Sequence, residues 1–243
     1  MKYAVFSVYI FLFLSFQLLP SIELPDSFGK THFIVGVDAQ KVIKQSTLKS
    51  CGTLEEILKP TEHGIHHVLF APDDDVLDLL KKLIEKEKTS IRMAAFLLTD
   101  YQIVKAIIGA KERGVLVEIV FDANGIRGKY AKIAGRLRSK GVDIFVYKSF
   151  ANYQKPKLSN IMHNKFIVFG ENIFGKPLLW TGSFNFTYSA HKVNQENIVI
   201  LDDDELIKKF SSRFDYIRNS LCYVFGKKNK KKARRSNNNK KRA

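Results

Sequence analysis

The sequence predicts an α/β domain in which a mixed, mostly parallel β-sheet has helices on both faces. From residue 66 onward, short runs of apolar residues alternate with capped or amphipathic segments, and this alternation is typical of a sheet covered by helices. Several of the runs contain almost no polar residue, which indicates strands buried on both faces. The chain has 243 residues and a hydrophobic content of 45%. It is therefore long enough for one sizeable domain with extensions.

Seven strands are expected where apolar and β-branched residues run together: residues 67–71, 90–98, 115–121, 142–147, 161–169, 178–181 and 197–201. Five helices are expected between or beside them: residues 53–59, 76–84, 100–113, 129–140 and 203–221. The acids Asp73 to Asp75 and Asp202 to Asp204 precede two of these helices and suit the positive end of the helix dipole. Asp100 suits the N-cap of the third helix, and Gly114 suits its C-terminal end.

The N-terminal residues 1–22 resemble a secretory signal peptide. Lys2 precedes an uncharged apolar stretch that ends at the helix-breaking Pro20. No clear cleavage site follows, and the stretch approaches the ~20 residues that a bilayer span requires, so a membrane anchor stays open. We expect a protein that is exported to the periplasm or secreted, or one held at a membrane by this segment. Residues 23–65 are broken by Gly and Pro and read as a linker or N-terminal extension.

The C-terminal residues 227–243 form a separate basic tail. They contain ten Lys or Arg, no acid and no hydrophobic residue larger than Ala, so they cannot build a core and are expected to be disordered. The whole chain has a net charge of +16, and the tail supplies most of it. Attraction to polyanions is expected, to nucleic acid or to the anionic surface of a phospholipid membrane.

The cysteines and most histidines give little chemical information. The chain has two cysteines, Cys51 and Cys222, which are far apart in the sequence. They indicate neither a zinc site nor a disulfide framework, and whether they pair stays open. His63, His66 and His67 cluster before the first strand without a matched Cys or carboxylate. They indicate an exposed loop rather than a metal site.

Three short phrases between residues 161 and 197 carry the chemistry. The first places His163 and Lys165 two residues apart, which on a strand puts both on one face. The second is Thr-Gly-Ser-Phe-Asn-Phe-Thr at 181–187, which combines a glycine that permits close backbone approach with two polar side chains two residues apart. The third, Asn-Gln-Glu-Asn at 194–197, places Glu196 at the start of a strand.

In order and spacing these phrases resemble the signature of the phospholipase D superfamily: His-x-Lys, Gly-Ser-x-Asn and a Glu-Asn strand. The Asn-Phe-Thr at 185–187 is most similar to small Nuc-type endonucleases, which hold one copy of the signature per chain. The resemblance extends over about residues 66–220 and implies a phospholipase D-like fold without metal or other cofactor. One position departs from the family pattern, because Gly170 stands where an Asp that supports the site is expected. Glu171 follows Gly170 and could replace that Asp, but a shift of one residue along a strand turns the side chain to the opposite face of the sheet.

The resemblance implies a role for each site residue. His163 would be the nucleophile and form a phosphohistidine, and Glu196 would accept a hydrogen bond from its other ring nitrogen. The phosphate oxygens would be held by a set of cationic and small polar groups: Lys165, Gly182, Ser183 and Asn185. One imidazole cannot attack phosphorus and protonate the leaving group at once. A second His163 is therefore expected from a second subunit, in a homodimer with the site at its two-fold axis.

Three functions fit this site. The first is a metal-independent nuclease on DNA or RNA, favoured by the Nuc-type resemblance and by the basic segment 129–140 and the basic tail. The second is a phospholipase D acting on phospholipid headgroups, favoured by the apolar N-terminus. The third is a non-catalytic polyanion-binding module, suggested by Gly170.

Truncation after Gly226 tests the role of the tail. Because the tail carries ten positive charges, its removal is expected to weaken binding to a labelled nucleic acid and to flatten the dependence of that binding on salt. Binding constants measured across a salt series check this, with a neutral Gly/Ser tail of the same length as the control. An unchanged salt dependence would show that the tail does not contribute.

Overall fold

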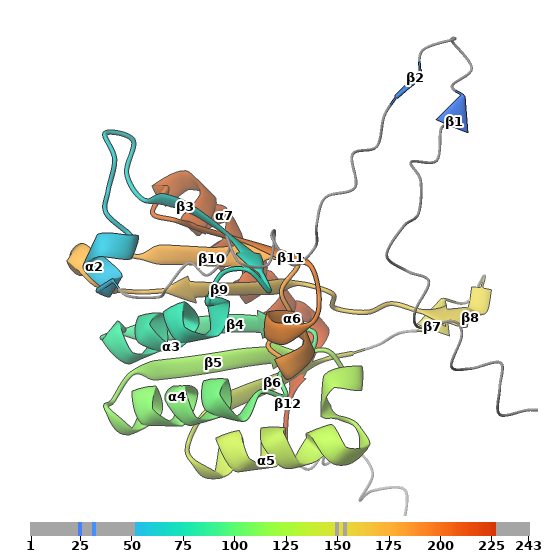
Figure 1. The fold of residues 1–243 in the computed structure, drawn as a ribbon. Coiled ribbons are helices and arrows are strands. Elements are labelled where there is room, and N and C mark those ends of the chain that lie inside the picture. The colour runs from blue at the N-terminus through green and yellow to red at the C-terminus, as the bar shows by residue number, and fades with distance from the viewer. Residues whose placement is uncertain (1–23, 26–30, 33–51, 149–150, 153–154, 227–243) are drawn as a thin grey trace, which may run out of the picture. The chain divides into compact units, whose positions relative to one another are not determined.

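The computed structural model describes residues 24–25, 31–32, 52–148, 151–152 and 155–226. The expected signal peptide or membrane anchor and the basic tail lie outside the described residues. The chain divides into two compact units, Met1–Thr47 and Leu48–Ala243. In the first unit the described residues form an antiparallel pair, β1 (Leu24–Pro25) and β2 (Thr31–His32). The second unit contains the predicted domain (Figure 1).

One large sheet organises the second unit. Its strands, in spatial order, are β12 (Cys222–Val224), β6 (Asp143–Tyr147), β5 (Leu116–Phe121), β4 (Ser90–Ala95), β9 (Lys165–Phe169), β10 (Leu178–Gly182), β11 (Glu196–Leu201) and β3 (His66–Ala71). A separate antiparallel pair, β7 (Ala151–Asn152) and β8 (Lys155–Ser159), precedes β9. All seven expected strands are present, and β7, β8 and β12 were not predicted.

The mixed sheet is confirmed, but its parallel share is smaller than predicted. In the described part of the sheet only β4 with β5 and β5 with β6 pair in parallel, and the other five pairings are antiparallel. The reason is the length of the connections. Crossover helices join β4 to β5 and β5 to β6, as parallel pairing requires, whereas β9, β10 and β11 pair with their neighbours in sequence and reverse direction each time.

The helices of this unit are α2 (Leu54–Ile57), α3 (Val76–Lys86), α4 (Tyr101–Glu112), α5 (Ala131–Ser139), α6 (Tyr188–Lys192) and α7 (Asp204–Tyr216). Short 3₁₀ turns occur at η1 (Asn124–Ile126), η2 (Gly128–Tyr130) and η3 (Ile173–Gly175), and a π turn, η4 (Ile217–Leu221), extends α7. The predicted capping is confirmed, since Asp75, Asp100 and Asp203 each accept a backbone N–H at a helix start. In the part of the chain that is described, no helix is both long and apolar enough to cross a membrane.

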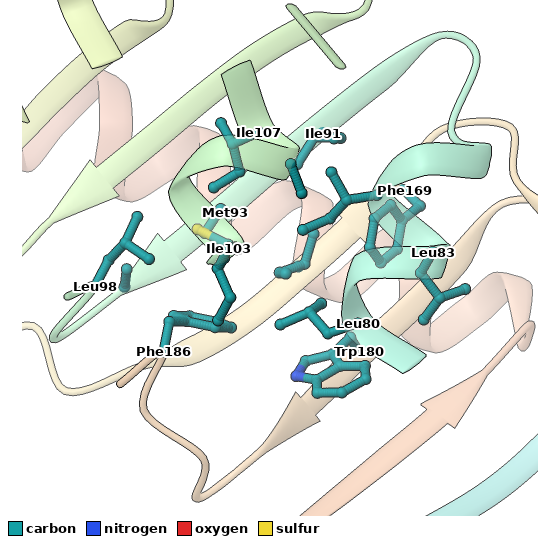
Figure 2. Packing of buried hydrophobic residues seen from close by; sticks show 14 of the residues in the cluster. Leu80, Leu83, Ile91, Met93, Leu98, Ile103, Ile107, Phe169, Trp180 and Phe186 are labelled. Atoms are coloured by element: carbon teal, nitrogen blue, oxygen red, sulfur yellow. The ribbon is translucent and has the colours of Figure 1, made fainter. Parts of the chain in front are cut away.

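Two apolar layers cover the two faces of the sheet, as predicted. On one face α3 and α4 pack on the sheet. Figure 2 shows Leu80 of α3 beside Trp180, and Ile103 and Ile107 of α4 beside Met93 and Ile91. On the other face α7 packs on β4, β9 and β10 through a second cluster. The end of the predicted N-terminal extension belongs to the first layer, because three of its apolar side chains are buried there: Leu54, Leu58 and Ile65.

Cys222 lies on β12 and is buried in the second cluster. It makes no disulfide, and Cys51 lies outside the described residues. Burial raises the pKa of the Cys222 thiol to about 12. The side chain therefore acts as a small apolar residue of the core.

A buried carboxylate joins the start of β4 to the end of β9. Glu87 is 2% exposed, and its side chain accepts hydrogen bonds from two strand ends: from Thr89 N and Oγ1 (2.9 and 3.1 Å), Ser90 N (2.9 Å), Gly170 N (3.2 Å), Glu171 N (2.9 Å) and Asn172 Nδ2 (3.1 Å). A Cβ at Gly170 would lie 2.3 Å from Thr89 Oγ1 and 2.5 Å from Ser90 Oγ. An Asp at position 170 would therefore require the Thr89 and Ser90 hydroxyls to move, and the carboxylate at these strand ends is that of Glu87.

Glu171 does not replace the Asp expected at position 170. Its carboxylate forms an ion pair with Lys88 at 2.9 Å, and both side chains are substantially exposed.

The substitution Glu87→Ala is expected to lower the free energy of unfolding by about 3 kcal/mol, because it leaves several buried N–H groups without an acceptor. Urea unfolding measures this. The matched control is Glu171→Ala, which removes an exposed ion pair and is expected to cost less than about 1 kcal/mol. Equal effects of the two substitutions would contradict the role given to Glu87.

Candidate active site

The six predicted site residues meet in one pocket. A cavity of about 550 Å³ is lined by His163, Lys165, Gly182, Ser183, Asn185 and Glu196, together with Asn164, Phe166, Thr181 and Phe210. Because β9, β10 and β11 are antiparallel neighbours, the start of β9, the end of β10 and the start of β11 lie at the same end of the sheet. Three phrases that are separate in the sequence therefore contribute to one site.

His163 lies before the strand rather than on it, contrary to the prediction, because β9 begins at Lys165. A buried carboxylate holds this irregular segment: Asp122, at the end of β5, accepts the backbone N–H of Met162 at 2.8 Å and that of Asn124 at 2.8 Å. The exposed His163 ring packs edge-on against Phe96, with 4.6 Å between centroids. Asp122 and Phe96 thus fix the backbone and the ring of the predicted nucleophile.

Lys165 is only 6% exposed. Its ammonium donates to the carbonyl oxygen of His163 at 2.8 Å and lies 5.2 Å from the centre of the Phe96 ring. Burial lowers the pKa of Lys165, while the nearby Glu196 carboxylate opposes that shift. Among the described residues no carboxylate forms an ion pair with it, so most of its hydrogen-bonding capacity faces the pocket.

Glu196 is held by neighbours other than His163. Its two oxygens accept hydrogen bonds from Ser183 Oγ at 2.5 Å and from Asn194 Nδ2 at 3.0 Å. Ser183 Oγ in turn accepts the backbone N–H of Asn197 at 3.1 Å. The predicted hydrogen bond from the His163 ring to Glu196 is not made in the described structure, where Ser183 and Asn194 are the side-chain donors to this carboxylate.

Gly182 and Asn185 differ in what they offer. A Cβ at Gly182 would lie 2.0 Å from the carbonyl oxygen of Asn197 on β11. Glycine is therefore required at position 182 because β10 lies close to β11 there. From the sequence we had expected this glycine to let the backbone approach a ligand. The buried Oδ1 atom of Asn185 has no hydrogen-bond partner within the described residues. Since an amide can present either its oxygen or its NH₂ group, Asn185 is available to a ligand in the pocket.

The sequence alone missed four residues of this site: Phe96, Asp122, Asn194 and Phe210. Phe96 and Asp122 directly follow β4 and β5, and the carboxyl ends of parallel strands are where sites of α/β sheets occur, so position in the chain could have revealed them. Asn194 stands in the third phrase. Phe210 comes from α7 and stacks edge-on with Phe166 at 5.0 Å, a contact that no local pattern signals.

The histidine cluster does not form a metal centre in the structure. His63 is exposed and lies 3.1 Å from the Glu62 carboxylate, while His66 and His67 alternate along β3 and point to opposite faces. Burial lowers the pKa of His67. Throughout the described ranges, no three His, Cys, Asp or Glu side chains are grouped so as to hold a metal ion.

Comparisons with known proteins identify the family of the chain. The family model described as "Cardiolipin synthase, PLD-like domain" matches residues 80–218. Phospholipase D of Rickettsia conorii is 34% identical over 141 residues, which cover 58% of this chain and 63% of that protein. The mitochondrial cardiolipin hydrolase of Danio rerio is 26% identical over 200 residues, which cover 76% of this chain and 82% of that protein.

A solved structure is also similar. Nuc, a phospholipase D family member from Salmonella typhimurium, is 29% identical with a TM-score of 0.56, and the match covers 66% of this chain and 97% of Nuc. The match to the Rickettsia protein spans less than two thirds of that protein's length. The family model covers more than half of the present chain. The chain therefore belongs to the phospholipase D superfamily.

Proposed function

We propose that the protein is a phosphodiesterase that hydrolyses phosphodiester bonds through a phosphohistidine, with nucleic acid as its substrate. The observation that carries the proposal is the meeting of a nucleophile, a buried cation and small polar groups in one pocket of about 550 Å³. A phosphodiester is already anionic, so an attacking group needs positive charge and hydrogen-bond donors around the phosphate oxygens. The pocket offers both.

In the first step a ring nitrogen of His163 attacks phosphorus, and the bond from phosphorus to the leaving oxygen breaks. The Lys165 ammonium and the Ser183 and Asn185 side chains hold the phosphate oxygens as charge develops. When Ser183 turns to the phosphate it releases one oxygen of Glu196, which then accepts the N–H of the other His163 ring nitrogen. The hydrogen bond between Ser183 and Glu196 is thus exchanged when substrate binds.

In the second step water attacks the phosphohistidine and restores the imidazole. The leaving oxygen must first receive a proton, and the pocket as described contains a single histidine. His163 of the partner subunit supplies this proton and then takes one from the attacking water. The proposed active form is a homodimer with its two pockets facing across a two-fold axis.

Charge favours nucleic acid. Arg127 and the exposed Lys148 follow β5 and β6 at the sheet end that holds the pocket. Of the acids at that end, Asp100 and Asp122 are buried and accept backbone N–H groups. Glu196 lies in the pocket itself, and the exposed Asp73 and Asp75 follow β3 on the far side of β11. The cations beyond β5 and β6 therefore favour phosphates on that side of the pocket, in agreement with the resemblance to Nuc-type endonucleases.

A phospholipid is the second candidate, and an apolar strip favours it. Phe166, Thr181, Val199 and Val68 lie opposite one another across β9, β10, β11 and β3, so their side chains share one face of the sheet. The strip runs from the pocket wall to the edge strand, where Val68 is 51% and Phe70 56% exposed. A hydrocarbon chain beside a bound phosphate would fit such a strip. Relatives named phospholipase D and cardiolipin hydrolase support this alternative.

Hydrolysis of plasmid DNA, RNA and labelled phospholipid vesicles, each in the presence of a chelator, separates the candidates. We expect cleavage of nucleic acid to persist in the chelator and to fall at least ~10³-fold in His163→Ala, because the nucleophile is lost. The control His63→Ala removes an exposed histidine outside the pocket and is expected to retain activity. Binding without cleavage of any substrate would instead indicate a non-catalytic module.

The substitution Lys165→Met tests how much the buried ammonium group lowers the stability of the folded protein. Because burial lowers the pKa of Lys165, the folded protein holds this proton less tightly than the unfolded chain. Stability is therefore reduced below the lowered pKa, and the penalty disappears as pH rises to the ordinary value of 10.5. The variant is expected to lose activity yet unfold at a higher urea concentration at pH 7, and this gain is expected to shrink at alkaline pH.

The matched control for this experiment is Lys208→Met, which changes a lysine on the outer helix α7. It is expected to leave both activity and the pH dependence of unfolding unchanged. A Lys165→Met protein that is less stable than the parent at pH 7 would contradict the assignment.

A further inference from the structure

The helices on the two faces of the sheet carry different charge. Within their bounds, α3, α4 and α5 contain eight Lys or Arg and three Asp or Glu. On the other face α7 contains three of each. One helical layer is therefore strongly basic, while the other is neutral. We call the outer surface of α3, α4 and α5 the basic face.

Much of the positive charge on the basic face is not used within the fold. Lys82 is paired with Asp78 at 2.9 Å and Lys86 with Glu55 at 3.4 Å. In contrast, Lys81, Lys105 and Lys132 form no ion pair with any residue that the structure describes. Unpaired cations gathered on one face raise the local concentration of anions and therefore favour an anionic partner there.

The basic face is also hollowed. A groove of about 590 Å³ runs between α3 and α4. Lys81, Lys105 and Arg113 line it together with one carboxylate, Glu85, and the small residues Ala106 and Gly109. Tyr101, 58% exposed, stands at one end of the groove. The guanidinium of Arg136 from α5 lies 4.8 Å from the centre of its ring and donates to its hydroxyl at 3.0 Å.

The groove opens at the sheet end that holds the catalytic pocket. Phe96 contacts His163 at the end of β4, and Tyr101 begins α4 after a short loop. In that loop the backbone N–H groups of Thr99 and Asp100 donate to the carbonyl oxygen of Phe186, next to the pocket residue Asn185. A chain of phosphates that leaves the pocket can therefore continue along α4 into the groove.

We propose that the basic face binds the phosphate backbone of a nucleic acid whose scissile bond lies in the catalytic pocket. Lys81, Lys105 and Arg136 contact successive phosphates, and Tyr101 offers an aromatic surface to a base or sugar. The proposal rests on the nucleic-acid substrate proposed above. A membrane fits this face less well. Among the described residues of α3, α4 and α5, Tyr101 is the single large hydrophobic side chain that is exposed, and the surface is grooved rather than flat.

The test compares two triple variants of the full chain in a His163→Ala background, where bound DNA is not cut. Lys81→Gln/Lys105→Gln/Arg136→Gln neutralises the basic face, and Lys208→Gln/Lys209→Gln/Arg213→Gln removes the same charge from α7. Anisotropy of a labelled oligonucleotide is measured across a salt series. The slope of log K against log salt is expected to fall by about 2 to 3 for the first variant, since each phosphate contact contributes ~0.7 to 0.9, and to stay unchanged for the second.

A milder variant and a small substrate complete the test. Lys105→Gln alone is expected to lower the slope by ~0.7 to 0.9. With His163 intact, the basic-face variant is expected to raise the KM for long DNA about tenfold or more while hydrolysing bis(4-nitrophenyl) phosphate normally, because that ester reaches only the pocket.

Two outcomes would overturn the proposal. Equal slopes for the two triple variants would show a general effect of net charge, and a loss of binding to anionic vesicles without a loss of binding to DNA would assign the face to a membrane. Failure of the parent protein to hydrolyse either substrate would refute the proposed activity, while the comparison of DNA binding would still stand.

Discussion

The antiparallel placement of β9 between β4 and β10 is the constraint on which the site depends. In this register Lys165 lies opposite Ala95, and Phe166 lies opposite both Ala94 and Thr181. Side chains alternate along a strand, so a slip of one residue would turn Lys165 away from its present face and bring Phe166 there. The register is held from both directions: by the apolar packing of Ile167 and Phe169 in one layer, and by Phe166 and Val168 in the other.

Local patterns predicted much of the fold and most of the site. Apolar runs located seven strands, and capping residues such as Asp100 located helices, because these signals act over a few residues. The order of the strands depends on which distant segments pair, and so the sheet proved less parallel than predicted. The position of His163 before β9 also depends on a distant contact, since the carboxylate of Asp122, which follows β5, holds that segment. Phe210 reaches the pocket only through the packing of α7.

The departure at Gly170 shows how a missing residue can be replaced from elsewhere in the chain. In sequence the position lacks a carboxylate, and the neighbouring Glu171 faces solvent and pairs with Lys88. In space the backbone N–H groups at this end of β9 are satisfied by Glu87, which belongs to the segment before β4. The substitution therefore changes which part of the chain holds the strands together, and it lies at the end of β9 opposite His163. It gives no reason to regard the site as decayed.

Cys222 has a consequence for the environments in which this domain can operate. Its thiol is buried and stays protonated at physiological pH, so it is a poor nucleophile towards oxidants and other disulfides. Among its described residues, the domain that carries the pocket thus has no reactive thiol and no disulfide. Passage from a reducing compartment to an oxidising one would leave the described part of that domain without a new disulfide.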